Sequence, residues 1–88
     1  MVRNAVEVLR RYVGKDITDW FSHYYGGDFP VRYTLQKVTH RDIVVTCKQG
    51  QKVWDIRFRP SVFFSRKVDW DYAPADLRKA YEYEGEGE

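Results

Sequence analysis

The hydrophobic periodicity of this chain changes at Val31, and this change constrains the fold more than any other feature. Before Val31, apolar residues recur at the three- and four-residue spacing typical of amphipathic helices; after it, apolar and polar residues alternate, which is typical of half-buried strands. In residues 31–36, Val31, Tyr33 and Leu35 alternate with Arg32, Thr34 and Gln36. The pattern predicts an α+β fold in which helices cover one face of an antiparallel sheet.

Two helices are predicted before the sheet. The first covers residues 2–13 and ends at Gly14, which can adopt the positive φ of a helix C-cap. The second begins at Asp16, whose carboxylate can accept hydrogen bonds from free backbone N–H groups, and ends at Gly26. The apolar residues on one face of each are Val2, Ala5, Val6, Leu9 and Val13 in the first, and Ile17, Trp20, Phe21 and Tyr24 in the second.

Three or four antiparallel strands are predicted next, followed by a short C-terminal helix. The strands are residues 31–36, 43–48, 53–59 and, at an edge of the sheet, 62–70. Turns are expected at residues 40–42 and at Gly50, where a positive φ costs little. Pro74 suits the first turn of the last helix. The whole of residues 1–84 is expected to form one domain, with residues 85–88 as a disordered acidic tail.

The composition favours a small domain of an intracellular protein. The one cysteine, Cys47, excludes an internal disulfide and lies among the apolar positions of its strand, so a buried and unreactive thiol is expected. No run approaches the roughly 20 apolar residues of a membrane span. Charged residues within the first 15 positions argue against a signal peptide. We therefore expect a cytoplasmic or other intracellular location and no membrane partner.

The net charge of +2 conceals a strong segregation of charge along the chain. Residues 1–28 have four basic and four acidic side chains, residues 29–68 have nine basic against two acidic, and residues 69–88 have two basic against seven acidic. The middle segment, with a net charge of +7, is the one predicted to form the sheet. Segregation of this kind bears on partners and association rates.

Strand alternation predicts that the cations collect on the face of the sheet turned away from the core. The candidate binding residues on that face are Arg32, Gln36, Thr46, Lys48, Arg57, Arg59 and Lys67. Lys and Arg can contact phosphates, and Thr and Gln can add hydrogen bonds to phosphate and sugar. Tyr25, Phe29 or Phe63, if exposed, could stack on unpaired bases.

The leading hypothesis is a non-enzymatic module that binds nucleic acid, RNA ahead of DNA, through this basic face. The alternative is a protein-interaction module or small inhibitory or regulatory protein that docks on an acidic partner. No catalytic, metal-binding or cofactor-binding constellation is expected, because His23 and His40 lack ligand spacing to each other or to Cys47. A homodimer is a further possibility, since Trp20, Tyr24, Tyr25 and Trp70 exceed what a small core readily buries.

Two resemblances bear on these hypotheses. The order of helix, three or more antiparallel strands and helix resembles double-stranded-RNA-binding domains and the two Alu-domain proteins of the signal recognition particle, and the latter likeness implies RNA on a basic sheet face. The segment Val53-Trp-Asp-Ile-Arg-Phe-Arg59 resembles a strand of bacterial toxins that cleave messenger RNA on the ribosome. That second resemblance implies a ribonuclease, with His40, Arg57 and Arg59 as candidate active-site residues.

Overall fold

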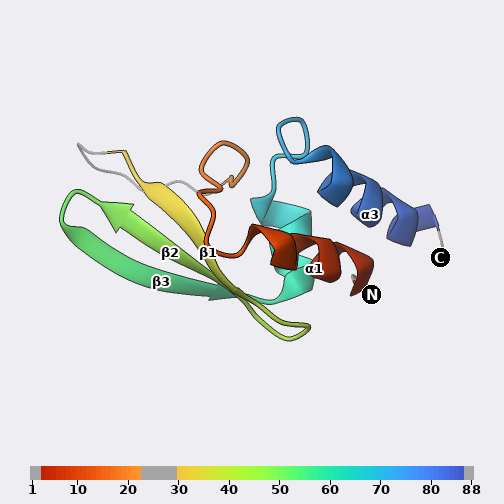
Figure 1. Ribbon diagram of the computed structural model, residues 1–88, viewed down its shortest axis with the longest axis horizontal. Helices are drawn as coiled ribbons and strands as arrows, with labels where there is room; N and C mark the ends of the chain where they lie inside the picture. The colour runs from red at the N-terminus through yellow and green to blue at the C-terminus, as the bar shows by residue number, and fades with distance from the viewer. Residues whose placement is uncertain (1–2, 23–29, 87–88) are drawn as a thin grey trace.

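The computed structural model describes residues 3–22 and 30–86 and shows an α+β fold (Figure 1). In chain order the elements are helix α1 (Arg3–Leu9), the 3-10 helix η1 (Arg10–Tyr12), strands β1 (Arg32–Val38), β2 (Ile43–Gln49) and β3 (Lys52–Phe58), helix α2 (Pro60–Val62), the π-helix η2 (Phe63–Lys67) and helix α3 (Ala75–Glu86). The helices gather toward one end of the molecule, and the β2–β3 turn lies at the other. The predicted α+β class with an antiparallel sheet is confirmed, whereas the number of helices differs from the prediction.

The three strands form one antiparallel sheet in the order β1-β2-β3. A two-residue turn, Gly50-Gln51, joins β2 to β3. Gly50 has a φ of 62°, while no non-glycine residue in the described chain has a positive φ, so this turn matches the type II′ pattern that favours glycine at its first central position. The β1–β2 loop is held by the Thr39 hydroxyl, which accepts hydrogen bonds from the backbone N–H groups of Arg41 and Asp42. Both predicted turns are confirmed.

The prediction of a second helix from Asp16 is wrong for the part of it that the structure describes. Residues 14–18 instead run alongside β1, at the edge of this strand that does not pair with β2. The Gly14 N–H donates to the Leu35 carbonyl at 2.7 Å, the Leu35 N–H to the Lys15 carbonyl at 3.1 Å, and the Ile17 N–H to the Tyr33 carbonyl at 2.8 Å. Only one helical turn follows, closed by the Phe21 N–H and the Ile17 carbonyl. His23, Tyr24, Gly26 and Gly27 lie outside the described residues.

The predicted fourth strand, residues 62–70, is also wrong, because residues 60–67 are helical. Pro60 begins α2, a position where its missing N–H costs nothing. Phe63 and Phe64 are both fully buried, which adjacent residues of a strand with one covered face cannot achieve but adjacent residues of a helix can. Val68 retains a single bridge to Phe21.

The core lies between the inner face of the sheet and the segments that cover it. Phe21 contacts Tyr33 of β1, with ring centroids 4.7 Å apart, and also packs against Phe58 of β3 and Phe63 of η2. The other fully buried side chains on the inner face of the sheet are Leu35, Ile43, Val45 and Cys47. On the opposite face of the sheet, called the outer face below, no helix of residues 3–22 and 30–86 packs against the strands.

Helix α3 packs against α1. The Tyr12 hydroxyl donates to Asp76 Oδ1 at 2.7 Å, and burial together with this bond raises the pKa of Tyr12 to about 12. The predicted C-terminal helix is confirmed and runs to Glu86, two residues into the segment expected to be disordered; residues 87–88 lie outside the described chain. No helix among the described residues combines the length and apolar character that crossing a bilayer requires.

Candidate functional site

The strand register decides which polar side chains share the outer face, because directly opposed residues of an antiparallel pair point to the same side. Arg32 is opposite Lys48, Thr34 is opposite Thr46, and Thr46 is opposite Asp55. Val44 lies between Lys37 and Arg57. The charged residues of β1–β3 on this face are therefore Arg32, Lys37, Lys48, Asp55 and Arg57.

Four of the seven predicted site residues lie on the outer face of the sheet. Lys48 and Arg57 are exposed, Thr46 is half-buried, and Gln36 is exposed at an irregularity of β1. Arg59 lies one residue beyond β3 at the start of α2, also exposed, so it extends the line of cations that Arg57 begins. The structure thus brings together most of the surface that alternation predicts.

Arg32 is on the outer face but is held in an ion pair. Its guanidinium donates to Asp16 Oδ2 from Nη2 at 2.8 Å and from Nε at 3.1 Å. Burial alone would raise the pKa of Asp16, but hydrogen bonds from Thr18 and Arg32 outweigh it and the pKa is lowered. The charge of Arg32 is therefore largely balanced, and this residue contributes less to the field of the face than the sequence suggests.

Lys67 does not lie on the outer face, so its expected position is wrong. It belongs to η2, and its ammonium lies 5.6 Å from the ring centroid of Phe58, an inner-face residue. The error follows from treating residues 62–70 as a strand, since a helical segment places Lys67 on the side of the sheet where the helices pack.

Lys37 belongs to the outer face, although sequence alternation misses it. Strict alternation after Tyr33 and Leu35 would put Lys37 on the inner face. The pairing shifts between Leu35 and Lys37, so that Gln36 is the extra residue of a β-bulge and Lys37 is opposite Val44. Val44 is only 6% exposed on this otherwise solvent-facing side, flanked in register by the aliphatic stems of Lys37 and Arg57. Nothing in the sequence marks the bulge.

Asp55 is the one acidic residue that the described strands place on the outer face. Its Oδ1 accepts a hydrogen bond from the Thr46 hydroxyl at 2.8 Å. This contact keeps the carboxylate in the middle of the face, between the Arg32–Lys48 end and the Lys37–Arg57 end. The outer face therefore has two cationic ends and an acidic centre, rather than a uniform positive field.

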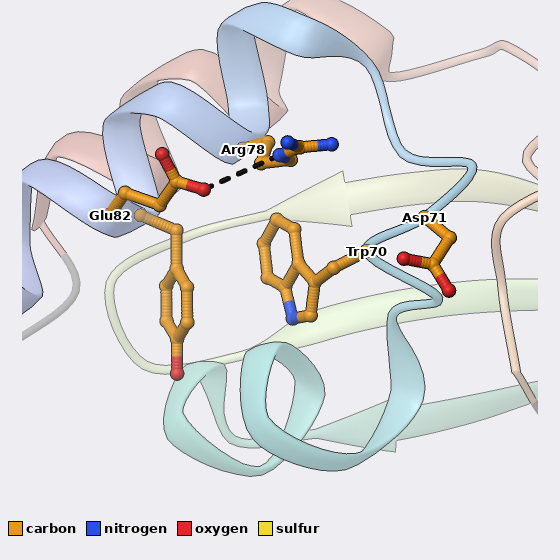
Figure 2. Close-up of a pocket in the computed structure, with 5 residues that line it drawn as sticks. Trp70, Asp71, Arg78 and Glu82 are labelled. Atoms are coloured by element: carbon orange, nitrogen blue, oxygen red, sulfur yellow. Dashed lines mark hydrogen bonds and ion pairs between the residues drawn. The ribbon is translucent and has the colours of Figure 1, made fainter.

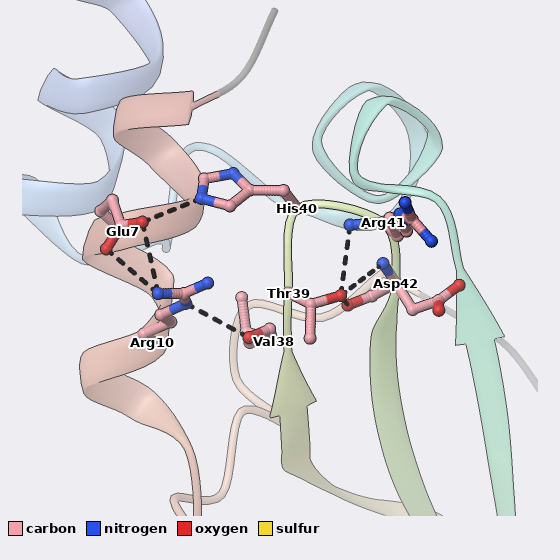
Figure 3. A network of polar contacts seen from close by, with 7 residues as sticks. All are labelled: Glu7, Arg10, Val38, Thr39, His40, Arg41 and Asp42. Carbon is pink, nitrogen blue, oxygen red and sulfur yellow. Dashed lines mark hydrogen bonds and ion pairs between the residues drawn. The ribbon is translucent and has the colours of Figure 1, made fainter.

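The other residues singled out from the sequence occupy structural positions. Cys47 is fully buried, and burial, with a contribution from the Asp55 carboxylate, raises the pKa of its thiol to about 11, so the expectation of a buried thiol is confirmed. Phe63 is also fully buried and cannot stack on a base. His40 Nε2 lies 3.0 Å from Glu7 Oε1, which ties the β1–β2 loop to α1 (Figure 3). Tyr25 and Phe29 fall outside the described residues.

A shallow pocket of about 380 Å³ lies between the 70–71 turn and α3 (Figure 2). Trp70 and Tyr81 stack there with ring centroids 4.6 Å apart, and Arg78 pairs with Glu82 at 3.3 Å. The indole N–H of Trp70 donates to the Phe64 carbonyl. Both rings, together with Arg78 and Glu82, thus already have partners, and Asp71 completes the lining of the pocket. No group of three or more metal-ligating side chains occurs within residues 3–22 and 30–86.

Comparison with protein-family models, with curated proteins and with solved structures finds no match to this chain. The fold and the site are therefore interpreted from their own geometry.

Proposed function

We propose that this protein binds nucleic acid through the outer face of its sheet. The observation that supports this most directly is that Lys37, Lys48, Arg57 and Arg59 are all exposed on or beside one sheet face, which no helix in the described part of the chain covers. From the spacing of strands and the rise per residue, Lys37 and Arg57 lie about 10 Å apart across β2, Lys48 lies about 14 Å from each of them, and Arg59 lies about 20 Å from Lys48. Separations of this size suit contacts to several phosphates of one backbone.

The chemistry of the face favours contacts to phosphate and sugar over stacking on bases. Thr34, Thr46 and Gln36 supply hydroxyl and amide groups between the cations. The rings of Tyr33, Trp54 and Phe58 belong to the inner face. Binding is therefore expected to depend weakly on sequence and strongly on salt, because each Lys or Arg contact releases condensed counterions.

An electrophoretic-shift titration against RNA, single-stranded DNA and duplex DNA at two salt concentrations tests the proposal. With about four phosphate contacts, affinity should fall on the order of 100-fold between roughly 50 and 200 mM salt. The double variant Lys48→Glu/Arg59→Glu should weaken binding further while the far-ultraviolet circular dichroism stays unchanged. Lys79→Glu, an exposed charge reversal on α3, is the matched control and should bind as the wild type does.

Two results would refute nucleic-acid binding by this face: no shift with any of the three probes at low salt, or equal losses in the double variant and the Lys79→Glu control. RNA is the first probe to test, since the sequence hypothesis places RNA ahead of DNA.

A second candidate function is docking on a protein with an acidic surface. The observation that favours it is the mixed character of the outer face, where Asp55 lies between the cations and Val53 is 61% exposed. A carboxylate and an apolar side chain weaken phosphate binding, whereas a protein surface can offer partners to both. Recovery of a stoichiometric protein from a nuclease-treated lysate, lost with Lys48→Glu/Arg59→Glu, would support this function over the first.

A further inference from the structure

The open edge of the sheet at β3 has the features of a pairing surface. β3 pairs with β2 over all seven residues in continuous register, without a bulge and without proline. Within the described chain no element pairs with its other edge. Natural edge strands are usually blunted by prolines, bulges, inward-pointing charges or a covering segment. Within the described residues β3 has no proline, no bulge and no covering segment, and its mid-strand charges, Asp55 and Arg57, point to the outer face. Its one charge in the inner-face phase, Lys52, lies next to the β2–β3 turn, at the end of the edge.

The hairpin geometry shows which backbone groups this edge offers. In a two-residue hairpin the residues that flank the turn, here Gln49 and Lys52, exchange both of their backbone hydrogen bonds. Hydrogen bonding to β2 then alternates along β3. Val53, Asp55 and Arg57 consequently direct their N–H and C=O groups away from β2, and the side chains of all three are exposed. The edge is a regular row of donors and acceptors.

We propose that this edge pairs with the same edge of a second copy of the chain, giving a two-fold symmetric dimer with a six-stranded sheet. The argument rests on charge. When two β3 strands pair antiparallel about a two-fold axis at Ile56, Asp55 of each copy lies opposite Arg57 of the other. Two reciprocal ion pairs form on the outer face.

The neighbouring registers lack this complementarity. An axis at Asp55 opposes the two Asp55 carboxylates, and an axis at Arg57 opposes the two guanidinium groups. Like charges directly opposite each other destabilise a pairing. Arg57 has no ion-pair partner among the described residues of its own chain. The Ile56 register is thus the one in which β3 complements itself.

The sequence suggests a homodimer because the chain has more large aromatic residues than a small core readily buries. The packing of the described tryptophans does not support that reason. Trp20 is only 7% exposed, and Trp70 is stacked on Phe64 and Tyr81, so the tryptophans that suggested a dimer from the sequence are accommodated within one chain. Tyr24 and Tyr25 lie outside the described residues. The proposed contact depends on β3 instead.

Reciprocal charge reversal tests the register directly by sedimentation equilibrium, in the absence of nucleic acid and therefore independently of the proposed function. Asp55→Arg alone and Arg57→Asp alone each convert both ion pairs into repulsions, and each should weaken the dimer roughly tenfold or more. An equimolar mixture of the two variants restores opposite charges at both contacts and should form a heterodimer about as stable as the wild-type dimer.

Changes at Val53 provide a second test that leaves the Asp55–Thr46 hydrogen bond intact. In the Ile56 register Val53 lies opposite Arg59 of the second copy, so Val53→Glu should tighten the dimer and Val53→Lys should loosen it, by a few-fold each. Lys79→Glu on α3 is the control and should leave the association constant unchanged. Circular dichroism confirms that each variant is folded.

Three outcomes would overturn the proposal. The first is a monomeric wild-type chain at about 100 µM, where a micromolar dimer would be fully assembled. The second is a dimer whose stability is the same in the single charge variants and in their mixture. The third is equal effects of Val53→Glu and Val53→Lys, since these changes differ in the sign of the charge they place opposite Arg59.

Discussion

The two edges of the sheet are closed to different extents. At the β1 edge, residues 14–18 cover the strand with backbone hydrogen bonds, and the Arg32–Asp16 ion pair lies across the contact. At the β3 edge the described chain supplies no such segment, and Val53 is 61% exposed. Both strands have seven residues and a similar alternation, so a distant part of the chain, rather than the strand itself, decides which edge is closed.

The largest test of this difference is truncation of an apolar residue at each edge. Ile17 is fully buried in the segment that closes β1, so Ile17→Ala should lower the free energy of unfolding by about 2–5 kcal/mol. Val53→Ala at the open edge should change it by no more than about 0.5 kcal/mol. Urea unfolding followed by circular dichroism measures both. Equal losses would show that the two edges contribute alike.

A second test removes the hydrogen bonds of the Thr18 hydroxyl at the closed edge, which connect it to Tyr33 and to the Asp16 carboxylate. The Thr18 hydroxyl accepts from the Tyr33 N–H at 2.9 Å in a partly buried position. Thr18→Val keeps the side-chain shape and leaves this N–H without an acceptor, which should cost about 1–3 kcal/mol in unfolding free energy. Thr18→Ser retains the acceptor and should lose clearly less. If serine and valine are equally destabilising, the hydrogen bond is not what holds the segment.

A third test concerns the backbone that leads into the closing segment. Gly14 has a φ of +87°, and a Cβ added there would meet nothing within 4 Å. Gly14→Ala should therefore cost only the backbone penalty of a positive φ, about 1–2 kcal/mol in unfolding free energy. Gly14→Asn, whose side chain tolerates this region better, should cost less when compared by thermal unfolding. Equal melting temperatures for the wild type and the alanine variant would contradict this.

The smallest expected effect is electrostatic. The pKa of Asp16 is lowered in the folded chain by its bonds to Thr18 and Arg32, which outweigh its burial. Because the folded pKa lies below the unfolded value of about 3.9, the ion pair stabilises the fold above about pH 4, and this contribution is lost as the pH falls through the folded pKa.

Replacement of Asp16 tests this contribution. Asp16→Asn should cost about 0.2–1 kcal/mol in unfolding free energy at neutral pH, since both partners are substantially exposed. The difference from the wild type should shrink as the pH is lowered from about 5 to about 2. Urea midpoints measured across this range provide the comparison, and a difference that grows in acid would refute the assignment.

The strands, the β2–β3 turn and the start of α3 could be predicted from the sequence because residues within or next to each element specify it. Alternation located β1, β2 and β3, and Gly50 identified the β2–β3 turn by its tolerance of a positive φ. Pro74 marked the start of α3. Each of these signals lies within a few residues of the element that it specifies.

The two errors arose where one apolar pattern suits two structures. Ile17, Trp20 and Phe21 have the spacing of one helix face, but a single helical turn is enough to place all three on the same side. The backbone before that turn forms hydrogen bonds with β1 instead of continuing a helix. Phe63 and Phe64 break the alternation that a fourth strand needs, and Pro60 stands where a helix begins. These last two signals were present in the sequence and favoured a helix.

Most of the candidate site followed from alternation, and the exceptions each have a tertiary cause. Lys48, Arg57 and Thr46 lie on the outer face as predicted. Lys37 lies on the outer face because a bulge shifts the register of β1, and Lys67 does not lie there because η2 is helical. The charge of Arg32 is balanced by its ion pair with Asp16. The proposed interaction surface is consequently smaller and less uniformly positive than the sequence implies.

The sequence by itself determined the strands, their turns and the terminal helices, because hydrophobic period, glycine and proline act on the backbone within a single element. Only the tertiary structure decided which edge of the sheet is covered, where β1 shifts its register and which cations remain unpaired. Those outcomes depend on contacts between residues far apart in the chain, such as Arg32 with Asp16 and Leu35 with Gly14, and no local pattern encodes the partner.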